Sequence, residues 1–325
     1  MSSNNKQQTT NTSATLRLRS GQALSAGNQQ LTWIILAIGV VAVSTAAIFI
    51  RLCLETAGER SVGFSLFIAA SRLGIASLII LPAWRTIRQQ QVSLKAYYYA
   101  VAAGICLALH FASWTNSLSF TSIAASTTLV TTNAIWVPLF SWLWWREKPN
   151  NMTIWGILIA FCGGILIAAS DTSGGGSNSN PLLGDFLAVV GAWMVSWYVL
   201  FGREAQRAGL SIASYSAIVY TTAALVLFPL PFLFGSGYLG YPQAVYFYIL
   251  MLAMIPQLIG HTSLNFSLRF ISSTLVTLAV LFEPIGSSFL GWLIFGEVPS
   301  RLVLVGGIFL LVGVAMAIVS TKKSK

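Results

Sequence analysis

The sequence predicts an all-α polytopic membrane protein with ten transmembrane helices, arranged as two inverted five-helix repeats. Three observations carry this prediction: an apolar composition, an internal repeat and the placement of the basic residues. Apolar residues make up 56% of the 325 residues, and charged residues only 8%. The core of a soluble protein of this length cannot bury so many apolar side chains, so most of them must face lipid or other membrane helices.

The chain repeats itself at a fixed distance of 150 residues. The coincident pairs are Trp142 and Trp292, Glu147 and Glu297, Pro149 and Pro299, Gly156 and Gly306, Gly163 and Gly313, and Ser170 and Ser320. So many identities at one distance, without a gap, indicate an internal duplication.

Ten apolar runs have close to the ~20 residues that a bilayer requires. The first repeat, residues 31–170, holds the runs Leu31–Leu54, Ser61–Leu81, Ala96–Ser117, Ser122–Trp145 and Met152–Ala169. The second repeat, residues 183–320, holds the runs Leu183–Phe201, Ser211–Phe234, Ala244–Phe266, Ser272–Phe295 and Leu302–Ser320.

Three polar segments flank the repeats. Residues 1–30 are rich in Ser, Thr, Asn and Gln. We expect a disordered cytoplasmic tail there rather than a cleaved signal peptide, because the apolar run that follows is too long for one. Residues 171–182 contain the sequence SGGGSNSN, which is typical of a flexible linker and lacks the Lys-Ser/Thr ending of a phosphate-binding loop. Residues 321–325 form a basic cytoplasmic tail.

The basic residues orient the ten spans. The predicted loops on one side hold most of them: Lys6, Arg17, Arg19, Arg85, Arg88, Lys95, Arg146, Lys148, Arg203, Arg207, Arg269, Lys322, Lys323 and Lys325. The other side holds Arg51, Arg60 and Arg301. Because cytoplasmic loops are the basic ones, we expect both termini in the cytoplasm and the protein in the inner or plasma membrane. This placement accounts for the net charge of +10 without a nucleic-acid partner.

Five spans per repeat is an odd number, so the second repeat must cross the membrane upside down relative to the first. The turns agree with this inversion, since Arg146 and Lys148 flank Glu147, whereas Gly296 and Val298 flank Glu297. Inverted repeats with a binding site near the midplane recur in transporters, because an exchange of the two conformations opens the opposite face.

Two copies of one motif carry a resemblance to a known family. They are residues 281–300, LFEPIGSSFLGWLIFGEVPS, and the weaker residues 131–150, TTNAIWVPLFSWLWWREKPN. With the tandem five-helix units and the start of the second unit at Leu183–Arg203, the chain resembles EamA-type members of the drug/metabolite transporter (DMT) superfamily. The resemblance implies a ten-helix secondary transporter of small organic metabolites, frequently an exporter. In one departure, the first copy has Asn133 and Ala134 where the second has Glu283 and Pro284.

Ionisable side chains inside a bilayer cost roughly 2.5–3.5 kcal/mol each on insertion scales, so they are candidates for function. Here they are Arg72, His110, His261 and Glu283. Arg72 and Glu283 lie near the middle of their spans. On the functional interpretation they face a central cavity, where Arg72 attracts an anionic group and Glu283 exchanges a proton or selects an ammonium group. On the structural interpretation they form an ion pair that joins two helices.

Further candidates for substrate contacts lie at similar depth. Asn133 has the repeat position of Glu283, and Asn116 and Trp136 lie within the third and fourth spans. The two asparagines can equally bond across helices or back to the carbonyls of their own helix. His110 and His261, at adjacent repeat positions, either bond to a neighbouring helix or relay protons.

Other residues are assigned structural roles. Pro284 removes a backbone hydrogen bond inside a span, which makes it a candidate hinge. We expect Glu147 and Glu297 to contribute to membrane topology and to cap helices at the turns in which they lie. The three cysteines have no metal or disulfide spacing, and we expect neither a metal nor a cofactor. Small-residue stripes in the fifth and tenth spans suit tight packing within a monomer or a homodimer.

The leading hypothesis is a transporter, not an enzyme, that works by alternating access with protons as the candidate coupling ion. An Arg at the midplane suits carboxylates and a Glu suits amines, so the expected cargo is an exported amino-acid-like compound. An integral membrane enzyme is one alternative, although no acid closely follows either histidine. A non-transporting scaffold or receptor is another.

Overall fold

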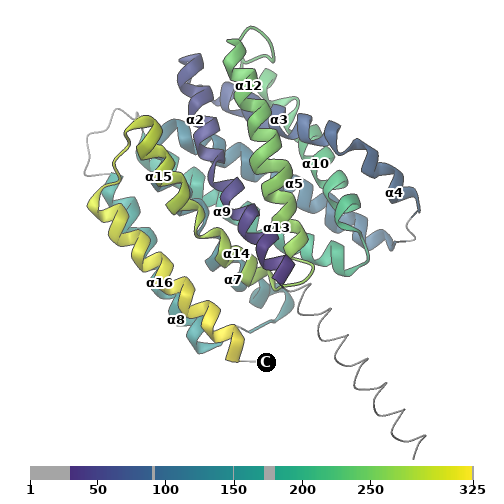
Figure 1. Ribbon diagram of the computed structural model, residues 1–325, viewed down its shortest axis with the longest axis vertical. Coiled ribbons are helices and arrows are strands. Elements are labelled where there is room, and N and C mark those ends of the chain that lie inside the picture. The colour runs from purple at the N-terminus through teal and green to yellow at the C-terminus, as the bar shows by residue number, and fades with distance from the viewer. Residues whose placement is uncertain (1–29, 90–91, 149, 172–179, 324–325) are drawn as a thin grey trace, which may run out of the picture.

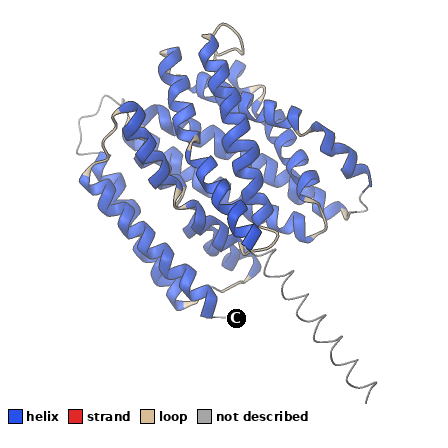
Figure 2. Ribbon diagram, viewed as in Figure 1, coloured by secondary structure: helices blue, strands red, loops and turns tan. Residues whose placement is uncertain are grey.

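The computed structural model describes residues 30–89, 92–148, 150–171 and 180–323. Within these residues the chain forms helices and connecting loops, and no strand (Figure 2). Eight helices are long and apolar enough to cross a membrane: Gln30–Ala57, Val62–Ile79, Leu94–Phe120, Ile123–Trp145, Pro181–Arg207, Ile212–Leu233, Gln243–Ser267 and Ser273–Phe295. The prediction of an all-α polytopic membrane protein is confirmed.

Two further helices correspond to the predicted fifth and tenth spans, α8 (Asn151–Asp171) and α16 (Arg301–Lys323). Their apolar stretches with described side chains, Asn151–Gly163 and Arg301–Gly313, are shorter than a bilayer requires. The count of ten transmembrane helices therefore stays a prediction. The expected N-terminal tail, most of the expected linker and the last two residues of the basic tail lie outside the described residues.

The first half of the chain begins with a span that ends in α2. Its further helices are α3, α4, α5, α6 and α7, and the bounds of all six are Ala46–Ala57, Val62–Ile79, Trp84–Gln89, Leu94–Phe120, Ile123–Val130 and Asn133–Trp145. Gly58 ends α2 at a φ of 64°, a conformation that glycine adopts without strain. The Ser61 hydroxyl then caps α3 by accepting a hydrogen bond from the Phe64 N–H.

The second half follows the same order. Its helices before α16 are α9, α10, α11, α12, α13, α14 and α15, with the bounds Pro181–Arg207, Ile212–Leu227, Leu230–Leu233, Gln243–Leu252, Thr262–Ser267, Ser273–Val280 and Glu283–Phe295. Between α12 and α13, residues Ala253–His261 form a π-helix that contains Pro256. Proline cannot donate to the preceding turn, so the widened π-helical turn accommodates it without ending the span.

Two spans break in the middle, at repeat-related positions. Thr131 and Thr132 separate α6 from α7, and Leu281 and Phe282 separate α14 from α15. At the first break the Thr132 hydroxyl donates to the Leu129 carbonyl at 2.6 Å, an alternative to the helical backbone bond. At the second break, Pro284 removes a backbone donor. Each repeat therefore carries a helix that is discontinuous at mid-depth at this repeat position.

The helices α8 and α16 lie side by side and run in opposite directions (Figure 1). Gly163 faces the backbone of Gly306, and Gly313 faces the backbone of Gly156. Position 163 against 306, with 156 against 313, is the pairing of antiparallel helices related by a two-fold axis. The two halves are thus inverted at this contact, as the odd number of spans predicts.

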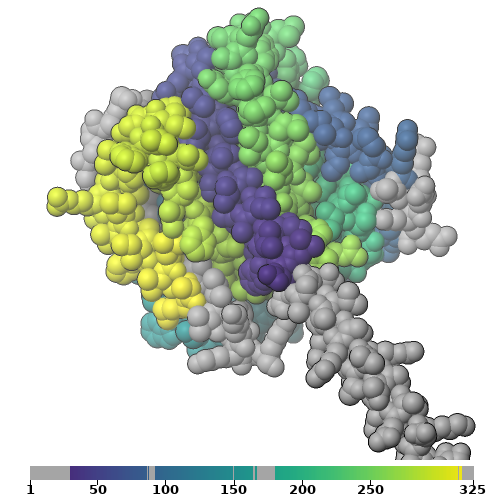
Figure 3. Space-filling model, in the orientation of Figure 1, coloured from purple at the N-terminus to yellow at the C-terminus, as the bar shows by residue number. Residues whose placement is uncertain are grey.

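The two ends of the bundle can be named by repeat-related residues. The first span begins, and α16 ends, at the lower end in Figure 1, where α7 also turns into α8. We call this the Glu147 end, and the opposite end, where α15 turns into α16, the Glu297 end. On the face seen in Figure 3, the first span is exposed between α15 and α12. The assignment of the Glu147 end to the cytoplasm stays a prediction.

Candidate functional site

Helices of both repeats enclose a cavity of about 50 Å³. Apolar side chains make up much of its wall, and the polar residues in the wall are His110, Thr131, Asn133, Tyr198, His261, Asn265, Thr277 and Glu283. Both helix breaks reach this cavity, because Thr131 lies in the first break and Asn133 directly follows it, while Glu283 directly follows the second. The discontinuous helices therefore bring polar groups of the two repeats to one enclosed place.

Glu283 is the first residue of α15 and is buried. Within the described part of the chain its carboxylate has neither a hydrogen bond nor an ion pair, and it faces the cavity. The positive end of the α15 helix dipole favours a negative charge at this place. A buried acid with an open carboxylate has the properties of a group that binds a cation or a proton.

The two histidines approach the cavity from different helices. His110 Nδ1 lies 2.9 Å from the Gly191 carbonyl oxygen. A carbonyl only accepts, so Nδ1 carries the hydrogen and Nε2 of a neutral ring is left as an acceptor. His261 ends the π-helix and packs its ring edge-on against Phe111, with ring centroids 5.4 Å apart. Its Nδ1 is buried without a hydrogen-bond partner among the described residues.

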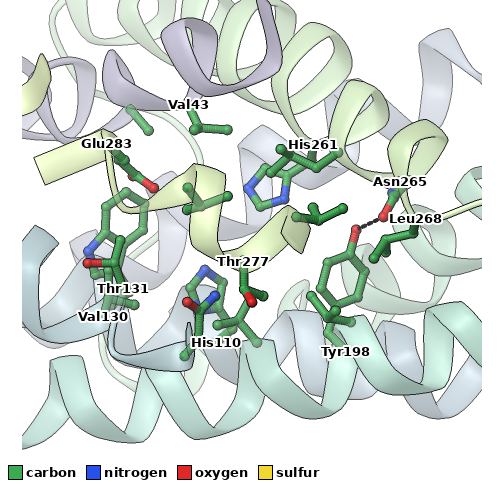
Figure 4. Close-up of a pocket in the computed structure, with 18 residues that line it drawn as sticks. Val43, His110, Val130, Thr131, Tyr198, His261, Asn265, Leu268, Thr277 and Glu283 are labelled. Carbon is green, nitrogen blue, oxygen red and sulfur yellow. Dashed lines mark hydrogen bonds between the residues drawn. The ribbon is translucent and has the colours of Figure 1, made fainter. Parts of the chain in front are cut away.

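Tyr198 and Asn265 form the polar wall opposite Glu283 (Figure 4). The Tyr198 hydroxyl donates to Asn265 Oδ1 at 2.6 Å. Asn265 Nδ2 and Asn133 Oδ1 are buried and have no partner in the described part of the chain. Buried polar atoms are nearly always satisfied, so these open donors and acceptors indicate a place for water or a ligand.

Four of the seven predicted binding or coupling residues line the cavity: His110, Asn133, His261 and Glu283. Asn116 and Trp136 lie outside its wall. Asn116 Nδ2 donates to the Ala112 carbonyl in its own helix, and Trp136 Nε1 donates to the Thr132 hydroxyl beside the first break. Pro284, the predicted hinge, sits at the second break.

Arg72 is buried in α3 and also lies outside the cavity wall. Its Nε donates to Gln257 Oε1 at 2.9 Å, and its guanidinium lies 3.9 Å from the centroid of the Phe111 ring. Among the ion pairs of the described residues, none joins Arg72 to Glu283. Arg72 thus supports the π-helix that carries His261, instead of meeting the acid.

Sequence reasoning did not select Gln257 or Asn265. Both are uncharged amides, which carry no strong signal in an apolar span. The neighbouring Pro256 could have drawn attention to Gln257, in the way that Pro284 drew attention to Glu283.

A second, larger hollow of about 410 Å³ opens at the Glu147 end. Leu268 lines both this hollow and the central cavity, so its buried side chain lies at the place where the two spaces are adjacent. A space of about 50 Å³ holds one or two water molecules. The central cavity is therefore small in this structure, and it lies next to the hollow at the Glu147 end.

An inverted helical bundle around an internal cavity with a few polar groups is an architecture that recurs in secondary transporters. The comparison with known families agrees and is more specific. The profile of the EamA-like transporter family matches residues 31–169 and again residues 182–319, and the chain belongs to this family, within the drug/metabolite transporter superfamily. The protein is thus an integral membrane transporter of a small-molecule substrate, as predicted.

Individual relatives of the chain are also named as transporters. An uncharacterized transporter of Archaeoglobus fulgidus is 23% identical over 287 residues, which cover 87% of this chain and 96% of that protein. The uncharacterized transporter YdfC of Bacillus subtilis is 26% identical over 203 residues, 62% of this chain and 64% of that protein. A solved crystal structure shares the fold, with a TM-score of 0.64 at 16% identity, and covers 91% of this chain and 99% of its own.

Proposed function

We propose that the protein is a secondary transporter that exports amino-acid-like compounds by alternating access, with proton coupling at Glu283. One observation carries this proposal: a broken helix from each inverted repeat ends against the same closed cavity, and Asn133 and Glu283 occupy equivalent positions there. Discontinuous helices at the interface of inverted repeats supply the binding groups of many secondary transporters.

The closed cavity is too small for an amino acid, so binding requires that it open. Leu268 lines both this cavity and the hollow at the Glu147 end, and we infer that movement of α14 away from α9 joins the two spaces. We assign this end to the cytoplasm from the distribution of basic residues. The substrate then enters from the inside, and rocking of one repeat against the other releases it outside.

The cavity wall supports a zwitterionic substrate. The open carboxylate of Glu283 suits an ammonium group or a proton, but not both at once, which is the requirement for exchange coupling. Asn265 Nδ2, across the cavity, is a donor available to a carboxylate. Arg72 lies outside the wall, so we assign it a supporting role through Gln257 instead of direct contact.

The test is flux in liposomes that contain only the purified protein. An untargeted comparison of metabolites exported by deletion and overexpressing cells first selects the compounds. We expect efflux without ATP that depends on a pH gradient, and Glu283→Gln should abolish this dependence or stop efflux. Glu55→Gln is the matched control, because Glu55 is an exposed acid outside the cavity.

The outcomes separate the alternatives. Normal efflux by Glu283→Gln across a range of pH would remove Glu283 from the coupling step. Absence of flux for every compound, together with a stably bound partner protein, would favour a scaffold. Chemical conversion of a supplied compound would favour an enzyme.

A further inference from the structure

Two ion pairs join the repeats at opposite ends of the bundle. Arg51 Nη1 lies 2.8 Å from Glu297 Oε1, and Arg203 Nη1 lies 2.8 Å from Glu147 Oε2. In each pair the arginine belongs to the first span of one repeat, and the glutamate follows the broken helix of the other repeat. The glutamates occupy the same repeat position. The two ion pairs are therefore the same arrangement of residues, present once at each end in inverted form.

At the Glu297 end this ion pair also forms hydrogen bonds with the start of a helix. Glu297 Oε2 accepts a hydrogen bond from the N–H of Ile123, the first residue of α6, at 3.2 Å. Arg51 Nη2 donates to the Thr121 carbonyl just before α6 at 2.9 Å. The start of the broken helix of the first repeat is thus bonded to the turn of the second repeat.

At the Glu147 end the equivalent contacts do not form among the described residues. The repeat-related partners would be the N–H of Ser273, the first residue of α14, and the carbonyl of Ile271. Both residues instead line the hollow of about 410 Å³, together with Glu147 and Arg203. Arg203 Nη2 is buried without a partner in the described part of the chain. The ion pair thus forms at this end without the contacts to the start of the helix.

A single side chain accounts for this asymmetry. The Ser141 hydroxyl donates to Glu147 Oε2 at 2.5 Å, whereas the repeat-related residue beside Glu297 is Gly291, which has no hydroxyl. Glu147 is also the more exposed acid, at 46% against 28% for Glu297. Ser141 therefore gives Glu147 a hydrogen bond within its own repeat, beside the ion pair with Arg203, that Glu297 lacks.

We propose that the ion pairs Arg51–Glu297 and Arg203–Glu147 are latches, each of which controls access to the cavity from its own end of the bundle. A latch closes its end when its glutamate accepts a hydrogen bond from the N-terminus of α6 or α14. This rests on the proposed function, since it deepens how the cavity opens to each side. A contact present in both states cannot shift their balance. The arginine–glutamate bond persists in both, so the helix N-terminus contact selects the state.

The test follows which side of the membrane reaches the cavity. Thr277→Cys places a thiol in the cavity wall, in a chain whose Cys53, Cys106 and Cys162 are replaced by alanine. A membrane-impermeant methanethiosulfonate is applied from either side of sealed vesicles. Lys148→Cys and Val298→Cys, at repeat-related exposed positions, mark the two ends. We expect faster labelling of position 277 from the Glu147 side.

Loss of the closed latch should reverse this preference. Hydrogen bonds to charged groups contribute strongly to stability. Loss of the Glu297 carboxylate in Glu297→Gln should therefore shift the ratio of labelling rates toward the Glu297 side by about tenfold or more. Ser141→Ala should shift it in the same direction by a smaller factor, because it frees Glu147 for α14. Glu55→Gln is the matched control, since Glu55 is an exposed acid that pairs with Arg60 outside both latches and should leave the ratio unchanged.

Ion pairs that only hold the two repeats together would give a different pattern of labelling ratios. If Glu297→Gln and Ser141→Ala both leave the ratio at the wild-type value, the pairs only hold the repeats together and the latch proposal is wrong. If Glu297→Gln does not accumulate in the membrane, Arg51→Lys takes its place, because lysine keeps the charge but cannot bond Glu297 and Thr121 together in the same fork. A shift in the ratio without any metabolite flux would uphold the latches while contradicting the proposed function.

Discussion

Gly163 of α8 lies directly against Gly306 of α16: an ideal Cβ at position 163 would stand 2.5 Å from the Gly306 carbonyl oxygen. Gly313 and Gly156 repeat this contact in inverted form. Backbone approach of this kind is typical of small-residue interfaces in membranes, where van der Waals packing, and not the hydrophobic effect, holds helices together. The pair joins the last helices of the two repeats.

This contact predicts a large effect for a small substitution. Gly163→Val should lower the free energy of unfolding by about 1–3 kcal/mol, because the backbone of α16 has to move away. Gly307→Val is the control, since a Cβ at position 307 meets nothing within 4 Å. Thermal unfolding in lipid nanodiscs measures both, and equal stability of the two variants would contradict the contact.

A second prediction concerns the wall opposite Glu283. Tyr198→Phe removes the donor to Asn265 Oδ1 and leaves a buried acceptor unsatisfied, at an expected cost of about 1–3 kcal/mol. Tyr98→Phe, on an exposed position of α5, should cost nothing measurable. Denaturant titration of the two variants checks this, and a Tyr198→Phe protein as stable as the wild type would mean that the bond does not form.

A third prediction separates support from binding at Arg72. Arg72→Lys keeps the charge but not the planar contact with Phe111, so the π-helix that carries His261 should lose its support. We expect turnover to fall by about tenfold with little change in the apparent substrate affinity. Gln257→Glu supplies a carboxylate to the lysine, and the double variant should recover part of the turnover. A loss confined to affinity would instead place Arg72 in contact with the substrate.

A fourth prediction concerns pH at the Glu147 end. Burial would raise the pKa of the Glu147 carboxyl, but the Ser141 hydrogen bond and the Arg203 guanidinium outweigh it and hold the pKa below its usual value. A carboxylate with a lowered pKa stabilises the fold above its unfolded pKa and loses that effect only as the pH falls through the folded value. Glu147 therefore stays charged between about pH 5 and pH 8.

The pH profile of efflux in this window should then be the same in wild type and Glu147→Gln, although the absolute rates differ. Glu283→Gln should flatten the same profile. Efflux from liposomes at graded external pH makes the comparison, and a flattened profile in Glu147→Gln would contradict the assignment of coupling to Glu283.

Much of the architecture could be predicted because it depends on local patterns. The apolar runs and the repeat gave the helices, and Glu283 followed by Pro284 marked the second helix break. The first break was harder to foresee, because Thr131 and Thr132 interrupt the helix through hydroxyl bonds to their own carbonyls, which many intact membrane helices also contain.

Pairings between distant segments could not be predicted. Arg72 bonds Gln257 across 185 positions, and Arg51 bonds Glu297 across 246. The sequence shows that an arginine lies within an apolar span and needs a partner, but it does not indicate which residue that partner is. Glu147 and Glu297 were therefore interpreted as turn and capping residues, whereas the structure joins each to an arginine of the opposite repeat.

The central claim is that one cavity serves both faces of the membrane in turn. The most direct test is the labelling of Thr277→Cys by an impermeant thiol reagent, added to one side of sealed vesicles at a time. The account predicts that each side alone labels the cysteine, more slowly from the Glu297 side. Labelling from a single side in the wild-type background and in every latch variant would contradict it.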